Sequence, residues 1–147
     1  MNKMYLITGL QASGKSSFCR RYLPDAVHIC LDDLHTRAKE AKAIGECIMR
    51  GEDFAVDNTN LSAEERRRYF DMIKDTDYTA VGYYMRSVLA ECLERNELRT
   101  GKAKIPRIAL AGSSKKLEMP SFSEGYSELY YVEMKESGFK ISPWKEA

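Results

Sequence analysis

The sequence predicts an α/β fold, in which a parallel sheet of about five strands carries helices on both faces. Two observations lead to this prediction. Short apolar segments, typical of buried strands, alternate along the chain with longer segments of helical pattern. Glycine-rich or polar residues follow the first strands, at the end of a parallel sheet where ligands bind. With 147 residues, we expect one domain spanning residues 1–147.

The first half of the chain is expected to contain three strands and three helices. The strands are residues 4–8, 26–31 and 54–56, which are short and mostly apolar. The helices are residues 15–22, about 34–50 and 62–74. Gly51 suits the end of the second helix, and Ser62 with Glu65 predicts a capping box at the start of the third.

The second half is expected to contain two strands and two helices. Residues 78–85 form a strand rich in aromatic and β-branched residues. Ser87 can cap a helix that continues to about residue 98, and Pro106 suits the first turn of a helix that ends near residue 117. Residues 127–134 are the last predicted strand.

The turn after the first strand carries Gly9, Gly14, Lys15 and Ser16 in the P-loop spacing G-x-x-x-x-G-K-S. Glycine lets the loop point backbone N–H groups at a phosphate, and the next helix adds its positive dipole end. Lys15 adds a charge over the β- and γ-phosphates, and the Ser16 hydroxyl can ligate Mg²⁺. We predict that a nucleoside triphosphate, expected to be ATP, is bound by Gly9, Gln11, Ala12, Ser13, Gly14, Lys15, Ser16 and Ser17.

Carboxylates follow the second and third predicted strands. A kinase needs a carboxylate at the position of Asp32 and Asp33 to orient or deprotonate an acceptor hydroxyl. One of the two aspartates can serve this purpose, while the other caps the next helix. Asp57 stands where a carboxylate holds Mg²⁺ or its waters, together with Ser16. The alternative interpretation is that these aspartates are only helix caps and turn residues.

A basic segment after the fourth strand predicts a lid over the triphosphate, at about residues 95–106. Arg95 and Arg99 are four residues apart, hence on one helix face, and they lead into Lys102 and Lys104. Such charges can stabilise the negative charge that develops during phosphoryl transfer. The alternative is a solvated helix, because Glu91 stands four residues before Arg95 and can pair with it.

Other residues give weaker signals. The run Arg66-Arg67-Arg68 is expected on an exposed helix face, and neither His28 nor His35 has a partner pattern typical of a metal site. The four cysteines contain no C-x-x-C pair, which favours reduced thiols and a cytoplasmic location. The chain begins almost directly in a predicted strand and has no long apolar run, so we expect no signal peptide and no membrane partner. No obligate protein partner is indicated.

Four motifs, in order, resemble the 5′-hydroxyl kinase module of polynucleotide kinases, within the wider P-loop kinases that bind ATP. They are Gly9 to Ser16, Leu31-Asp32-Asp33, Val56-Asp57-Asn58-Thr59-Asn60-Leu61, and Arg95-Asn96 through Arg99 to Ile105-Pro106. The resemblance implies that Asp32 is the general base, that Lys15 and Ser16 contact phosphate and Mg²⁺, and that Arg95 or Arg99 is the lid arginine. It further implies substrate contacts from Asp33, Asn58 and Asn60.

The resemblance has one departure, in the residues after the acidic pair. The family usually carries an arginine there that contacts the phosphate of the substrate, whereas Arg37 stands one residue later and would face elsewhere on a helix. Three functions therefore stay open. They are a kinase acting on the 5′-hydroxyl of single-stranded or end-exposed nucleic acid, a kinase acting on a nucleoside, sugar or other small alcohol, and a nucleotide-binding regulator without transfer. The net charge of +1 gives no general attraction to nucleic acid.

Overall fold

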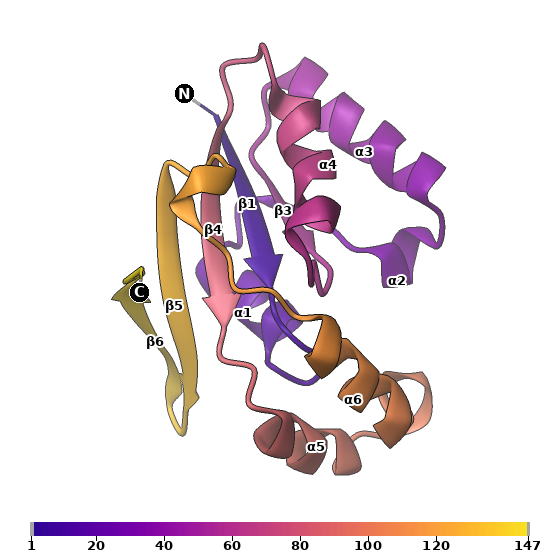
Figure 1. Cartoon of the computed structure of the whole chain (residues 1–147). Helices are drawn as coiled ribbons and strands as arrows, with labels where there is room; N and C mark the ends of the chain where they lie inside the picture. The colour runs from indigo at the N-terminus through magenta and orange to yellow at the C-terminus, as the bar shows by residue number, and fades with distance from the viewer. Residues whose placement is uncertain (1, 147) are drawn as a thin grey trace.

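A computed structural model describes residues 2–146, which form one six-stranded sheet with the strand order β2-β3-β1-β4-β5-β6 (Figure 1). The strands are β1 (Lys3–Thr8), β2 (Val27–Ile29), β3 (Phe54–Asp57), β4 (Thr79–Met85), β5 (Glu128–Lys135) and β6 (Gly138–Pro143). Strands β1 to β5 pair in parallel, as predicted. Because β1 lies between β3 and β4, the P-loop leaves the middle of the carboxyl edge of the sheet.

Helices cover both faces of this sheet, as predicted. The helices are α1 (Lys15–Tyr22), α2 (Leu31–Leu34), α3 (Arg37–Arg50), α4 (Ala63–Ile73), α5 (Leu89–Glu97) and α6 (Arg107–Lys116), with short 3₁₀ turns at Gly101–Ala103 and Phe122–Glu124. Helices α3 and α4 lie on one face and α1 on the other, while α5 and α6 extend beyond the carboxyl edge (Figure 1).

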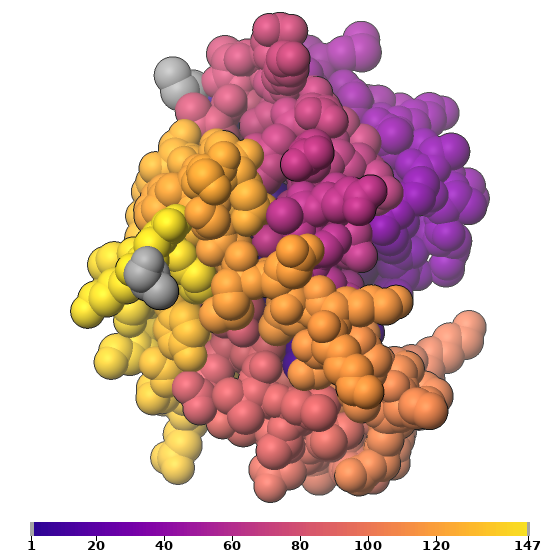
Figure 2. Space-filling view, viewed as in Figure 1, coloured from indigo at the N-terminus to yellow at the C-terminus, as the bar shows by residue number. Residues whose placement is uncertain are grey.

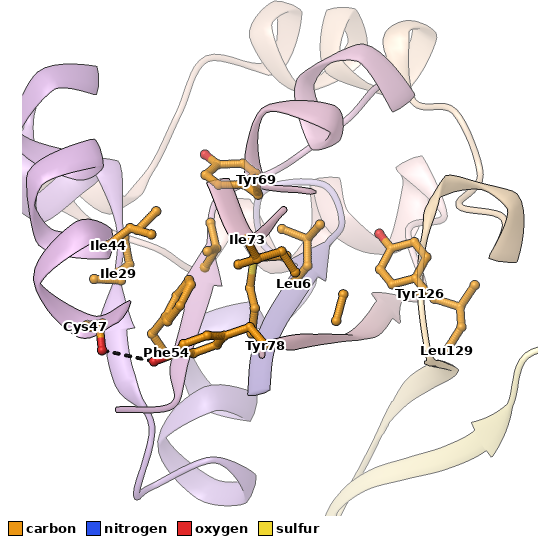
Figure 3. Close-up of a cluster of buried hydrophobic side chains, with 13 residues drawn as sticks. Leu6, Ile29, Ile44, Cys47, Phe54, Tyr69, Ile73, Tyr78, Tyr126 and Leu129 are labelled. Atoms are coloured by element: carbon orange, nitrogen blue, oxygen red, sulfur yellow. Dashed lines mark hydrogen bonds between the residues drawn. The ribbon is translucent and has the colours of Figure 1, made fainter. Parts of the chain in front are cut away.

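The core has two layers because successive residues of a strand point to opposite faces. Leu6 of β1 belongs to the larger cluster, which α3 and α4 cover and to which Ile44 and Tyr69 contribute (Figure 3). Ile7 points to the other face and packs with Phe18 of α1. Alternation along one buried strand thus fixes both layers.

Strand β6 corrects the prediction of a five-stranded, all-parallel sheet. It pairs antiparallel to β5, with Val132 opposite Ile141. Gly138 has a φ of +147°, which favours glycine in the tight connection between the two strands. The segment is short and contains only exposed and half-buried residues, so it lacks the apolar run that identifies a buried strand.

The segment between β2 and α3 also differs from the prediction of one helix over residues 34–50. Strand β2 ends at Ile29 rather than Leu31, and residues 31–34 form the short helix α2. His35 then takes a left-handed conformation with φ of +70°, which separates α2 from α3. The side chain of Thr36, rather than an aspartate, caps α3 by accepting from the backbone N–H of Lys39.

The remaining helix ends confirm some predicted caps and correct others. Gly51 ends α3 with a φ of +66°, as predicted. Ser62 caps α4 by accepting from the Glu65 N–H, whereas the Glu65 carboxylate accepts from the Leu61 N–H, one residue before the place that a capping box requires. Ser87 does not cap α5, because Val88 occupies the N-cap position and the Ser87 hydroxyl donates to the Met85 carbonyl instead. Pro106 precedes α6 rather than lying in its first turn.

Two sequence expectations concern the whole chain. The described residues include no helix that combines the length and the apolar character needed to span a bilayer. All four cysteines are buried and free, in agreement with the prediction of reduced thiols.

Candidate active site

The P-loop joins β1 to α1 and has the backbone strain that a phosphate-binding turn requires. Gly14, directly before α1, has a φ of +96°, and a Cβ atom there would collide with the side chain of Met134 on β5. Ala12 also has a positive φ, of 65°. In addition, the Leu10 N–H donates to the Ser87 hydroxyl at 2.9 Å, which fixes the loop to the segment after β4. The loop is therefore held in one shape from both sides.

Lys15 lies folded over this loop. Its ammonium donates to the carbonyls of Gly9 at 3.1 Å and Leu10 at 2.9 Å. Burial lowers the pKa of Lys15, the negative charge of Asp57 opposes this effect, and the positive charge of Arg99 adds to it. An anion in the loop would compensate the burial of this ammonium.

Ser16 and Asp57, the two predicted metal ligands, are joined by a direct contact. The Ser16 hydroxyl donates to Oδ2 of Asp57 at 2.6 Å. The same oxygen lies 2.6 Å from Nε2 of His28. Burial acts to raise the pKa of Asp57, but the hydrogen bonds from His28 and Ser16 and the charge of Lys15 hold it below its ordinary value. A carboxylate that stays ionised beside a hydroxyl is an oxygen donor set suited to Mg²⁺.

A cavity of about 300 Å³ unites residues from the P-loop, the segment after β2, the end of β3 and the segment after α5. It is lined by Gln11, Ala12, Gly14, Lys15, Ser16, Ser17, Cys30, Leu31, Asp32, Asp57, Asn58, Thr59 and Arg99. Figure 2 shows the surface hollowed at the right of the view, between the purple α2–α3 segment and the salmon turn between α5 and α6. The four predicted motifs thus meet in one place.

The two adjacent aspartates differ in their relation to this cavity. Asp32 lines the cavity, whereas Asp33 does not. Both are exposed and lie in α2, directly after the edge strand β2. The structure therefore distinguishes two residues that the sequence pattern could not separate.

The two predicted lid arginines also differ. Arg99 lines the cavity and donates to the Ala103 carbonyl at 3.2 Å. Arg95 donates instead to the Ala12 carbonyl of the P-loop at 3.2 Å and pairs with Glu91 at 3.7 Å, which is the alternative partner expected from the sequence. Asn96 is fully buried and exchanges two hydrogen bonds with the backbone of Ile105, at 2.7 and 3.0 Å, and so fixes the start of the turn to its end.

The two asparagines expected at the substrate are used by the fold. The Asn58 amide donates to Glu40 at 2.8 Å and to Tyr69 at 3.1 Å, and its oxygen accepts from the Leu31 N–H at 2.9 Å, although the residue still lines the cavity. Asn60 is only 4% exposed, lies outside the cavity lining and donates to the Ile7 carbonyl at 2.7 Å. Gly9 and Ser13 are not among the residues that line the cavity, and Ser13 is buried.

Sequence reasoning missed two charged residues near the site. Arg66 is fully buried rather than exposed, because Glu124 accepts from its Nε at 2.7 Å and from its second terminal nitrogen at 3.1 Å. The prediction that Arg66, Arg67 and Arg68 are all exposed is therefore wrong for Arg66 and confirmed for Arg67 and Arg68. Glu40 is fully buried and accepts from Arg37 at 3.1 Å and from the Tyr69 hydroxyl. Neither burial has a local signal in the sequence, because Glu124 lies 58 residues from Arg66 and Tyr69 lies 29 residues from Glu40.

Arg37, the residue that departs from the family pattern, lies outside the cavity lining. It is the first residue of α3, after the break at His35, and it donates to the Tyr69 hydroxyl at 2.8 Å. Its side chain is 47% exposed.

Sequence comparison places this chain beside polynucleotide kinases. It is 22% identical over 138 residues to the bifunctional polynucleotide phosphatase/kinase of Schizosaccharomyces pombe, which covers 90% of this chain and 34% of that protein. A protein of Acanthamoeba polyphaga mimivirus, provisionally given the same name, is 33% identical over 81 residues, or 54% of this chain and 19% of that protein. The chain thus spans about a third or less of the length of these curated relatives. No protein-family model matches it.

Comparison of structures leads to P-loop kinase folds. A gluconokinase from Sinorhizobium meliloti superposes with a TM-score of 0.64 at 21% identity, covering 89% of this chain and 82% of the other. Kti12 from Chaetomium thermophilum, solved in complex with ADP-AlF3, superposes with a TM-score of 0.69 at 17% identity, covering 91% and 92%. The chain therefore has the fold of the P-loop kinases and resembles the polynucleotide kinases in sequence.

Proposed function

We propose that this chain is a Mg²⁺- and ATP-dependent kinase that transfers the γ-phosphate to a hydroxyl, namely the 5′-hydroxyl of DNA or RNA. The observation that carries the proposal is the single cavity that Lys15, Ser16 and Asp57 share with Asp32 and Arg99. Phosphate and metal ligands therefore face the same space as a free carboxylate. A regulator that only binds nucleotide has no need of that carboxylate.

The binding half of the site would be formed by the P-loop and the end of β3. The backbone N–H groups at the start of α1, with Lys15, would hold the phosphates of ATP. Ser16 and Asp57 would ligate Mg²⁺, which supplies charge neutralisation at the β- and γ-phosphates when bound. The contact of 2.6 Å between the Ser16 hydroxyl and the Asp57 carboxylate supports this assignment, because it brings the two donors together.

The transfer half would be formed by Asp32 and Arg99. Asp32 would accept the proton of the acceptor hydroxyl. The oxygen of that hydroxyl would bond to the γ-phosphorus as ADP departs with the bridging oxygen. Lys15 and Arg99 would stabilise the negative charge on the phosphoryl oxygens. The similarity to the fission yeast and mimivirus proteins supports a nucleic-acid acceptor.

A small alcohol is the second candidate acceptor, and one observation favours it. The basic segment around Arg99 is partly neutralised, because Glu97 pairs with Lys104 at 3.3 Å and with Arg107 at 3.6 Å. A groove for a long polyanion usually keeps such charges free.

Transfer of γ-labelled phosphate to a panel of acceptors tests the proposal. The panel contains a single-stranded 5′-hydroxyl oligonucleotide, its 5′-phosphorylated form as a matched blank, a nucleoside and gluconate. We expect label on the 5′-hydroxyl oligonucleotide alone, at a rate that falls as salt rises. Label on the nucleoside or gluconate instead would replace the nucleic-acid acceptor by a small alcohol. ATP binding that requires Lys15 without transfer to any acceptor would contradict a kinase.

A further inference from the structure

Three side chains of metal-binding type meet behind the nucleotide cavity. The sulfur of Cys19, a ring nitrogen of His28 and a carboxylate oxygen of Asp57 all lie within 4.8 Å of one another. They come from α1, β2 and β3 respectively. The sequence shows no metal-binding spacing here, since the three residues are separated by 9 and 29 positions.

The register of the sheet explains why they converge. His28 pairs with Ala55, and Asp57 lies two residues beyond Ala55 on the same strand. The side chains of His28, Ala55 and Asp57 therefore point to the same face of the sheet, which α1 covers. Cys19 packs against Ala55 in the core cluster of that face. The arrangement is therefore fixed by strand pairing and helix packing rather than by a mobile loop.

The group separates two cavities. Asp57 lines the nucleotide cavity, whereas Cys19 and His28 line a second cavity of about 360 Å³ that also includes Arg20, Leu23 and Ala26. The His28 side chain is 33% exposed, while that of Asp57 is 2% exposed. An ion could thus reach the group through the second cavity without passing the P-loop, and water there could complete its coordination.

We propose that Cys19, His28 and Asp57 form a Zn²⁺ site that shares Asp57 with the nucleotide cavity. A thiolate, an imidazole and a carboxylate are ligands of zinc, whereas Mg²⁺ prefers oxygen alone. Bond lengths of about 2.0–2.3 Å place tetrahedral ligands about 3.5 Å apart, so only small side-chain movements are needed.

Zinc binding would be a ligand exchange without redox chemistry. The Cys19 S–H bond breaks as the zinc–sulfur bond forms, and the proton passes to the solvent. Burial raises the pKa of the Cys19 thiol to about 12, so the free protein carries the proton that zinc binding releases. Nε2 of His28 gives up the proton that it shares with Asp57, so that the neutral ring keeps its proton on Nδ1, and this hydrogen bond is replaced by one bond from each residue to the metal.

The consequence for activity rests on the proposed function. If Asp57 ligates Mg²⁺, zinc at this site withdraws that carboxylate, and Zn²⁺ inhibits phosphoryl transfer in competition with Mg²⁺. The chain would then lose kinase activity when free zinc rises.

Titration of the metal-free full chain with Co²⁺, followed by Zn²⁺, tests the site itself. We expect a thiolate-to-cobalt charge-transfer band that saturates at one ion per chain and disappears on addition of zinc. Cys19→Ala should abolish the band, and His28→Gln should weaken cobalt binding at least about tenfold. Cys47→Ala and His35→Gln are matched controls outside the group and should retain the band. No band in the wild type, or its survival in folded Cys19→Ala, would overturn the site.

An activity measurement tests the competition separately. Zn²⁺ should inhibit labelled phosphate transfer by the wild type, excess Mg²⁺ should relieve the inhibition, and Cys19→Ala should be less sensitive to zinc. Equal sensitivity of the wild type and Cys19→Ala would overturn the competition. The cobalt titration needs no kinase activity, so a failure of the proposed function and a failure of the zinc site are distinguishable.

Discussion

The Ser16 hydroxyl donates a hydrogen bond of 2.6 Å to Oδ2 of Asp57. This contact joins the first turn of α1 to the carboxyl end of β3, through two residues that are 41 positions apart in the sequence. It brings together the two donors that we assign to Mg²⁺. The geometry of the site is therefore set by the pairing of β1 with β3, where Ile7 lies opposite Asp57.

Replacing Ser16 tests the metal assignment. Ser16→Ala removes one Mg²⁺ donor and leaves the backbone of the P-loop intact. We expect the Mg²⁺ concentration for half-maximal transfer to rise on the order of 10–100-fold, as for other losses around metal sites. Ser17→Ala, which removes a neighbouring exposed hydroxyl, should keep the wild-type Mg²⁺ dependence. Equal Mg²⁺ dependence of all three proteins would contradict the assignment.

The buried pair of Arg66 and Glu124 should contribute strongly to stability. Arg66 also donates to the carbonyls of Asn60 and Leu61, at 2.9 and 3.2 Å, so Arg66→Met leaves several buried acceptors unpaired. We expect a loss of about 3–5 kcal/mol in the free energy of unfolding, measured with urea. The exposed neighbour provides the control, since Arg67→Met should change it by less than about 0.5 kcal/mol. A small effect in both variants would show that the buried contacts are not formed.

The two arginines of the predicted lid should have separable effects on the kinetics. Arg99→Ala removes a charge from the cavity and should lower kcat about 100-fold. Arg95→Ala removes the donor to the Ala12 carbonyl and should mainly raise KM for ATP, because the P-loop loses a support. Steady-state kinetics with varied ATP distinguish these effects. The opposite pattern would assign the catalytic charge to Arg95.

The pair of His28 and Asp57 should make stability depend on pH. The hydrogen bond to Asp57 raises the pKa of His28 above its ordinary value of 6.5, although partial burial opposes this effect. The stabilisation is therefore complete below about pH 6.5 and is lost as the pH rises through the raised pKa. The pKa of Asp57 is lowered from its ordinary value of 3.8, so its contribution to the free energy of unfolding is complete above about pH 3.8. This contribution is lost as the pH falls through the lowered pKa.

Urea unfolding of the wild type and His28→Gln at several pH values measures this contribution. We expect the difference in unfolding free energy to be larger near pH 5–6 than near pH 9. A difference in unfolding free energy that does not change with pH would show that the contact with Asp57 does not raise the pKa of His28.

The sequence predicted those features that depend on local pattern. The P-loop, the alternation of strands and helices and the glycine at the end of α3 all follow from short-range spacing. Strand β6 was missed because its residues are mostly exposed or half-buried and its pairing with β5 is antiparallel. The break at His35 was missed because a left-handed residue without glycine gives no sequence signal.

The site was predicted by motif but not in its contacts. Asp32, Asp57, Lys15 and Arg99 converge as expected, because the carboxyl ends of parallel strands share one edge. The partners of His28 and Arg66 could not be predicted, because they lie 29 and 58 residues away and only the folded sheet brings them together. The sequence could not distinguish Asp32 from Asp33, because the short helix α2 determines which of them lines the cavity.

The most direct test of the account compares Asp32→Asn with the wild type in two measurements, ATP affinity and the single-turnover rate of labelled phosphate transfer. Asp32→Asn keeps the shape of the side chain and the residues proposed to bind ATP but removes the proposed base. We predict ATP affinity within about twofold of the wild type and a transfer rate reduced on the order of 10²–10⁴-fold. Asp33→Asn should transfer at close to the wild-type rate. Wild-type transfer by Asp32→Asn would contradict the proposed mechanism.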